Sequence, residues 1–250
     1  MNLTLQLDDY VSPFAAELPK VVTQDLIYQE RYEMDAVDHW MFGVNASSLV
    51  GTVAANQLVQ LGGATVPVYY ENYLTIKDNT GQALHTPVYD TANEFTLCCV
   101  AKQNHTGISI IAGSLGATDT PNGIGLFTSG GKIYLTIRTQ VSSLDLGLTA
   151  IDTSKPFFVA VSVTKLSSTS FTYRAIAYQN KVAYTKEGSM TGFVTSGSKL
   201  GFGNSRYTSA STAMLNLYEG IVYNKSLSLS QLQLLAERSR IRMEKRNQDF

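Results

Sequence analysis

Tyrosine side chains gather at two places in the sequence where they could contact a ligand. Tyr69, Tyr70 and Tyr73 are near neighbours, and Tyr207 follows Arg206 in a loop rich in Ser, Thr and Asn. Sugars present apolar C–H faces that stack on aromatic rings, while amide and hydroxyl groups hydrogen-bond their hydroxyls. These five residues are therefore the candidate glycan-binding side chains. The alternative is that they pack within the fold, because tyrosine is an ordinary strand residue.

An acidic stretch near the start of the chain is a candidate for catalysis. Retaining glycoside hydrolases use two carboxyl groups about 5–5.5 Å apart, one as nucleophile and the other as acid and base. Glu33 and Asp38, with Asp35 between them, are the candidate pair. The stretch reads as an acidic, helix-compatible segment ahead of the main domain, so a solvated helix face is the favoured interpretation.

Two pairs of loop residues carry oxygen atoms of the kind that bind calcium. Asp119 with Asn122 is the first pair, and Asp90 with Asn93 is the second. Calcium sites usually combine several carboxylates and carbonyls, whereas these loops are poor in paired carboxylates. Asp and Asn also hydrogen-bond their own backbone in ordinary turns. We therefore expect no obligatory cofactor, with Ca²⁺ at Asp119 and Asn122 as the secondary possibility.

The composition excludes several classes of protein. Charged residues make up 16% of the 250 residues and the net charge is −1, which argues against a surface built to bind nucleic acid. No apolar run reaches the roughly 18 residues that a membrane-spanning helix needs. The sequence contains no glycine-rich phosphate loop and no nucleophile-elbow serine. The first residues lack the pattern of a secretory signal peptide.

The two cysteines, Cys98 and Cys99, are adjacent. Neighbouring residues on a strand point to opposite faces, so a disulfide between these two would distort the backbone. Free thiols are typical of a reducing compartment.

Charge and periodicity divide the chain into three parts. Residues 1–40 hold eight acidic and two basic side chains, and we interpret residues 1–38 as an acidic assembly arm containing a strand and a helix. Residues 39–227 carry about a dozen short strands separated by turns, without intervening helices, which predicts an all-β sandwich or barrel. Ser129-Gly130-Gly131 and Gln179-Asn180-Lys181 are the clearest hairpin turns.

Residues 228–250 are predicted to form a capping helix with a basic tail. Ser228 and Gln231 have the spacing of a capping box, and four apolar side chains follow on one stripe. Arg238, Arg242 and Arg246 recur at intervals of four residues, which predicts one exposed basic side. The sequence beyond Glu237 reads as too polar for a core.

The order of these elements resembles the laminin G-like, or concanavalin A-like, jelly-roll family. Three stretches carry the resemblance. The first is the apolar strand Pro156-Phe157-Phe158-Val159-Ala160-Val161-Ser162-Val163, and the second is the hairpin Ala175-Ile176-Ala177-Tyr178-Gln179-Asn180-Lys181-Val182. The third has two parts, Lys199-Leu200-Gly201-Phe202-Gly203 followed by Tyr218-Glu219-Gly220-Ile221-Val222-Tyr223-Asn224-Lys225-Ser226-Leu227-Ser228. The likeness covers about residues 36–237 through loose motifs in a consistent order. It implies a sandwich of two antiparallel sheets.

The same resemblance implies a range of functions, because members of the family bind glycans or calcium, cleave glycans or act as interaction modules of cell-surface and bacteriophage virion proteins. Glycosidases on this fold have a pattern similar to E-x-D-x-x-E, which Glu33-Met34-Asp35-Ala36-Val37-Asp38 matches except for its last residue. We expect a non-enzymatic virion protein: a tail, baseplate or head-decoration subunit that forms a homo-oligomer through its arm, contacts other virion subunits and binds host glycan. A free lectin is the first alternative, and a glycoside hydrolase using Glu33 and Asp38 is the second.

Overall fold

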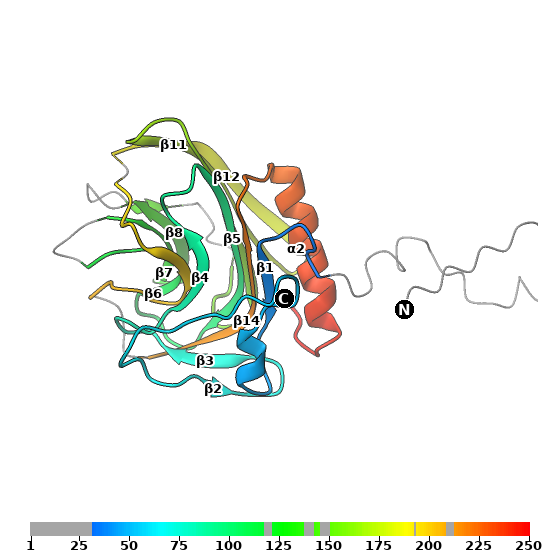
Figure 1. Ribbon diagram of the computed structural model, residues 1–250. Helices are drawn as coiled ribbons and strands as arrows, with labels where there is room; N and C mark the ends of the chain where they lie inside the picture. The colour runs from blue at the N-terminus through cyan, green and yellow to red at the C-terminus, as the bar shows by residue number, and fades with distance from the viewer. Residues whose placement is uncertain (1–31, 118–121, 138–142, 146–150, 193, 209–212) are drawn as a thin grey trace, which may run out of the picture.

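In the computed structural model, two antiparallel β-sheets face each other and the C-terminal helix covers the outer side of one of them (Figure 1). The structure describes residues 32–117, 122–137, 143–145, 151–192, 194–208 and 213–250. The predicted jelly-roll sandwich of two antiparallel sheets is confirmed. No helix in these ranges is both long and apolar enough to cross a membrane.

The larger sheet has eight strands. Along its main path the strands are β12 (Val182–Thr191), β11 (Ser170–Gln179), β10 (Phe157–Lys165), β5 (Glu94–Gln103), β14 (Met214–Tyr223), β3 (Leu74–Lys77) and β2 (Val68–Tyr69), and β1 (Asp38–Met41) also pairs with β14. The nearly continuous apolar sequence of β10 places it in the interior of this sheet, between β11 and β5.

The smaller sheet has six strands and lies across the core from the larger one. In order they are β4 (Leu84–Tyr89), β13 (Lys199–Phe202), β6 (Ser109–Gly113), β7 (Ile124–Ser129), β8 (Lys132–Ile137) and β9 (Ser143–Asp145). A short 3₁₀ turn, η1 (Ala46–Leu49), follows β1.

Both predicted hairpin turns are confirmed. Gly130 and Gly131 join β7 to β8, and Asn180 and Lys181 join β11 to β12. All four residues have positive φ, between 54° and 75°, as two-residue turns of type I′ require. Glycine meets that requirement without strain, whereas Asn180 and Lys181 adopt it as side-chain-bearing residues.

The space between the sheets is filled by large apolar side chains. Trp40 is fully buried there and packs edge-to-face on Phe202, while its indole N–H donates to the carbonyl of Asn56 at 3.0 Å. Cys99 belongs to this core, but Cys98 faces the opposite side of the sheet, and both thiols are free. The expected alternation of the two cysteines is therefore confirmed.

A second apolar cluster lies under the C-terminal helix α2 (Leu229–Glu244). The Ser228–Gln231 capping box is present at its start, with both reciprocal hydrogen bonds formed. The expectation of a polar, exposed tail beyond Glu237 is wrong. Met243 of α2 and Phe250 beyond its end are buried against the larger sheet, so the C-terminal segment packs on that face beyond Glu237 as well.

Candidate functional site

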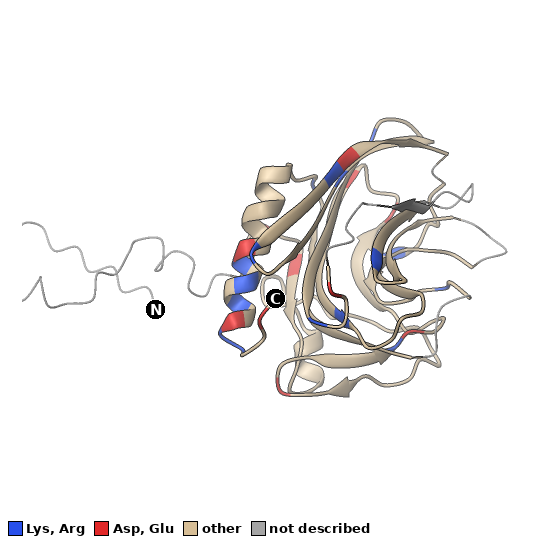
Figure 2. Cartoon of the chain, turned by 180° about the vertical axis from the view of Figure 1, so that it is seen from behind, with Lys and Arg blue, Asp and Glu red and all other residues tan. Residues whose placement is uncertain are grey.

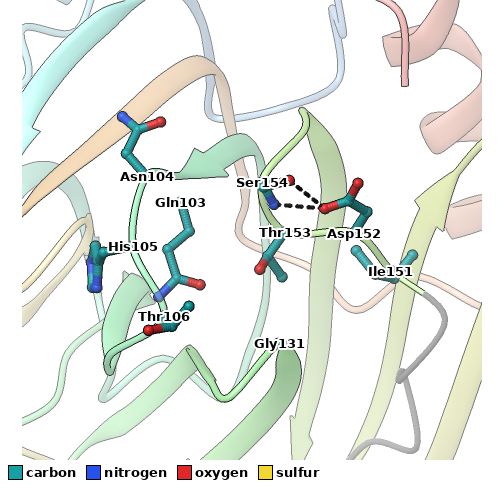
Figure 3. Close-up of a pocket in the computed structure, with 9 residues that line it drawn as sticks. All are labelled: Gln103, Asn104, His105, Thr106, Gly131, Ile151, Asp152, Thr153 and Ser154. Atoms are coloured by element: carbon teal, nitrogen blue, oxygen red, sulfur yellow. Dashed lines mark hydrogen bonds between the residues drawn. The ribbon is translucent and has the colours of Figure 1, made fainter.

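A pocket of about 480 Å³ opens at the end of β5, a volume within the range of small-molecule sites. Three chain segments form it: the turn from β5 to β6, the residues that precede β10 and, at Gly131, the turn from β7 to β8. The described residues that line the pocket are Gln103, Asn104, His105, Thr106, Gly131, Ile151, Asp152, Thr153 and Ser154 (Figure 3). Apart from Ile151 and Gly131, they contribute amide, hydroxyl, imidazole and carboxylate groups.

Backbone hydrogen bonds hold the two walls of the pocket together. The N–H of Gln103 donates to the carbonyl of Thr153 at 2.9 Å. The buried amide of Gln179 accepts from the N–H of Asp152 and donates to the carbonyls of Asp152 and Pro156. The ends of β5, β10 and β11 therefore hold the described walls of the pocket in place.

The amide of Gln103 lies between Thr106 and Thr153 in the interior of the pocket (Figure 3). Its Nε2 donates to the carbonyl of Gly107 at 2.5 Å, whereas its Oε1 is buried and accepts no hydrogen bond from the described residues. A buried acceptor without a donor costs roughly 1–3 kcal/mol, a cost that a ligand hydroxyl would remove once a rotation of the side chain exposes this oxygen to the pocket. This is the strongest indication in the pocket of a ligand that donates hydrogen bonds.

Behind this wall, His105 and Asp78 form a close pair. Nδ1 of His105 accepts from the N–H of Gly107, which places the proton of the neutral ring on Nε2, 3.4 Å from Oδ2 of Asp78. Burial lowers the pKa of His105, so its ring is neutral at pH 7. Burial raises the pKa of Asp78 to about 8, despite a hydrogen bond from the N–H of Ile110. The pair therefore carries little net charge at neutral pH.

The rim of the pocket carries one negative charge. The hydroxyl and N–H of Ser154 both donate to Oδ1 of Asp152, at 2.5 and 3.1 Å (Figure 3). These bonds, together with Lys155 at 3.7 Å from Oδ2, hold the pKa of Asp152 below its ordinary value. Asp152 is accordingly a solvent-facing carboxylate that stays ionised.

The three clustered tyrosines do not form one surface. Successive strand residues face opposite sides, and Tyr69 accordingly packs against the core between the sheets. Tyr70 is 45% exposed and stacks on Tyr73, with ring centroids 4.5 Å apart. Tyr73 packs in turn on the buried ring of Tyr218. The pair Tyr70 and Tyr73 is therefore a small exposed aromatic platform beside β2.

The other two predicted glycan-binding residues lie in the loop after β13. The side chain of Asn204 accepts from the N–H of Tyr207 and donates to its carbonyl, which fixes this loop in a tight turn. The carbonyl of Tyr207 also accepts from the hydroxyl of Thr80. Arg206 is exposed and lies near His85 of β4, whose pKa is lowered mainly by burial and further by this positive charge. None of the five predicted residues lines the pocket at the end of β5.

The candidate catalytic carboxylates have structural partners. Arg238 donates two hydrogen bonds to Glu33, and Arg242 donates a third. Asp38 is fully buried and accepts from the N–H groups of Val53, Ala54 and Asn56, among others. Burial alone would raise the pKa of Asp38, but these bonds lower it, which is the opposite of what a general acid needs.

Two predictions are wrong here: that the acidic stretch is helical, and that the basic side of the C-terminal helix is exposed. Residues 33–37 form a turn before β1 and are not the end of a helix. Arg238 and Arg242 do not point into solvent, because both bind Glu33 and Arg242 is only 7% exposed. Figure 2 shows that charged residues are concentrated on the C-terminal half of α2 and are sparse on the strands.

The calcium candidates are only partly within the described residues. Asp119 lies outside them, and the carbonyl of Asn122 accepts from the N–H of Gly116. The buried carboxylate of Asp90 accepts from Ser114, from the N–H and hydroxyl of Ser196 and from the N–H of Gly197. Within the described ranges, no group of three or more His, Cys, Asp or Glu side chains could hold a metal ion.

Comparison with known proteins identifies the fold. Solved structures similar to this chain include a botulinum neurotoxin serotype D binding domain, with a TM-score of 0.52 and 17% identity over 83% of this chain and 52% of that one. A sialidase of Trypanosoma rangeli in complex with 2,3-difluorosialic acid gives a TM-score of 0.57 and 14% identity over 83% of this chain and 33% of that one.

The chain shares the two-sheet antiparallel β-sandwich fold of these structures. It spans about half the length of the neurotoxin chains and a third of the sialidase chains, at identities that show a shared fold alone. No family profile and no curated protein matches the sequence.

Sequence reasoning missed the pocket because its walls are distant along the chain. Gln103 and Thr153 meet only through the pairing of β5 with β10, which begins two residues before Gln103, at Ala101 and Phe157. A local signal did exist. The polar runs Gln103-Asn104-His105-Thr106 and Asp152-Thr153-Ser154 each adjoin a predicted apolar strand.

Proposed function

We propose that this chain is a non-enzymatic glycan-binding module, and that the pocket at the end of β5 is its binding site. One observation carries the proposal: the buried Oε1 of Gln103 accepts no hydrogen bond from the described residues, and its amide lies in a pocket lined with amide and hydroxyl groups. Sugar hydroxyls donate and accept hydrogen bonds at close spacing, which is the chemistry that such a wall recognises. The lectin-like fold is compatible with this role but does not assign it.

Binding to a glycan array tests this proposal. Replacing Thr106 and Thr153 together by Val removes two pocket hydroxyls with little change in volume, and Gln103→Leu removes the unpaired acceptor. We expect each variant to lose at least tenfold in affinity, because every lost hydrogen bond leaves a ligand hydroxyl unpaired. Circular dichroism and thermal unfolding check that the variants are folded.

Tyr70→Ala is the matched control, because it removes the exposed ring of the rival aromatic platform and leaves the pocket intact. It should retain full binding. The proposal is wrong if Tyr70→Ala abolishes binding while the pocket variants bind normally, or if the chain binds no glycan at all.

We further propose that the glycan-binding sandwich belongs to a bacteriophage virion, as a structural or host-attachment subunit. The resemblance to sandwich domains of virion proteins supports this, as does the acidic excess at the start of the chain. An oligomer would raise weak glycan affinity through avidity. Its partners would be other virion subunits and further copies of itself, without nucleic acid or membrane insertion.

Light scattering after size exclusion tests the assembly part of this proposal. The chain should be compared with a version that starts at Tyr32, because the contacts of Glu33 with Arg238 and Arg242 belong to the folded body and must be kept. We expect the full chain to form a defined oligomer and the shorter chain to be a folded monomer. A monomeric full chain would contradict assembly through the arm.

A further inference from the structure

The charge of the pocket walls restricts the class of sugar that the proposed binding site can hold. None of the described lining residues is Lys or Arg. The segment that leads into Ile151, residues 146–150, contains no charged side chain in its sequence. Lys102, Lys132 and Lys155 adjoin lining residues in the chain, but none of the three is a lining residue itself.

The charged and acceptor groups of the pocket instead favour hydrogen-bond donors. Asp152 stands at the rim as an ionised carboxylate, about half exposed, with its negative charge only partly offset by Lys155 at 3.7 Å. Inside, Oε1 of Gln103 is an acceptor that requires a donor. His105 adds no positive charge, because its ring is neutral at pH 7.

We infer that the pocket selects neutral sugars that present hydroxyl donors and rejects sugars that carry a carboxylate, such as sialic acid. This inference rests on the proposed function of the same pocket and specifies its ligand class. A ligand carboxylate would add a second negative charge near Asp152 and would offer no hydrogen to Oε1 of Gln103, which accepts no hydrogen bond from the described residues. A neutral sugar meets both groups with hydroxyl hydrogens.

Matched glycan pairs test the inference, each pair consisting of a neutral chain and the same chain ending in sialic acid. Both members are titrated into the intact protein, into Asp152→Asn and into Asp249→Asn, which removes an exposed carboxylate elsewhere. We expect sialylation to weaken binding to the intact protein about tenfold, as charge repulsion at a solvent-facing site allows. This loss of affinity on sialylation should fall to about threefold or less in Asp152→Asn and stay about tenfold in Asp249→Asn.

Equal or tighter binding of the sialylated members, abolished by Gln103→Leu, overturns the inference while leaving the pocket as a glycan site. A tenfold penalty that Asp152→Asn leaves unchanged also overturns it, because Asp152 would then not be its source. Absence of binding by either member overturns the proposed function, and the inference with it.

Discussion

Arg242→Met is expected to destabilise the protein by about 3–5 kcal/mol, because it leaves two buried carboxylates without their shared cation. The guanidinium of Arg242 donates from Nε to Glu219 at 2.6 Å and from Nη1 to Glu33 at 2.8 Å. His39 lies 2.7 Å from the same oxygen of Glu219. These residues and Arg238 form a buried ionic cluster that joins the turn before β1, strand β14 and helix α2.

The control for this variant is Arg238→Met, one helical turn earlier. Arg238 binds the same carboxylate, Glu33, but its side chain is 27% exposed, so water can replace part of the interaction. We expect Arg238→Met to lower the free energy of unfolding by about 1 kcal/mol. Urea unfolding of both variants measures the difference. Equal losses for the two variants would contradict the account, because burial would then not decide the cost.

The buried ionic cluster also makes the stability of the protein depend on pH. Burial alone would raise the pKa of Glu219, but Arg242 and His39 outweigh it and hold that pKa well below its ordinary value. A carboxyl group whose folded pKa is depressed stabilises the fold above its unfolded pKa and loses this contribution as the pH falls. The difference in the free energy of unfolding between the intact protein and Arg242→Met should therefore decrease as the pH falls below about 4.5.

Asp78→Asn is expected to stabilise the protein increasingly as the pH rises. Burial raises the pKa of Asp78 from 3.8 to about 8 in the folded chain. Between these values the unfolded chain releases the proton and the folded chain keeps it, so the unfolded state binds fewer protons. The free energy of unfolding then decreases with rising pH. Asn resembles the protonated acid and does not titrate, so this decrease is absent from the variant.

The difference in the free energy of unfolding between Asp78→Asn and the intact protein should grow by about 5 kcal/mol from pH 4 to pH 8. Urea unfolding at several pH values measures it. Asp90→Asn is the matched control, because Asp90 is equally buried but its carboxylate accepts from Ser114, Ser196 and Gly197. That variant should be destabilised. A difference for Asp78→Asn that does not change with pH would show that Asp78 is ionised in the folded protein.

Local chemistry made the turns and helix start predictable from the sequence. The glycine pair at 130–131 and the Ser228–Gln231 box act through backbone conformation and hydrogen bonds within a few residues. The apolar run of β10 likewise placed it at the centre of a sheet.

The candidate site was harder to predict because burial depends on partners far along the chain. The arginines at 238 and 242 resemble an exposed basic face until Glu33, more than 200 residues away, is placed against them. The clustered tyrosines were named as candidate glycan-binding side chains from their closeness in sequence, but Tyr69 packs against the core while Tyr70 is exposed and stacks on Tyr73.

The most direct test of the central claim is to map the bound glycan on the protein. Amide resonances of the isotopically labelled 27.3 kDa chain can be followed by NMR while the neutral glycan with the strongest array signal is added. We predict shifts concentrated at residues 103–107 and 151–155. Shifts concentrated around Tyr70 and Tyr73, or around Arg206 and Tyr207, would contradict the assignment of the pocket at the end of β5 as the glycan site.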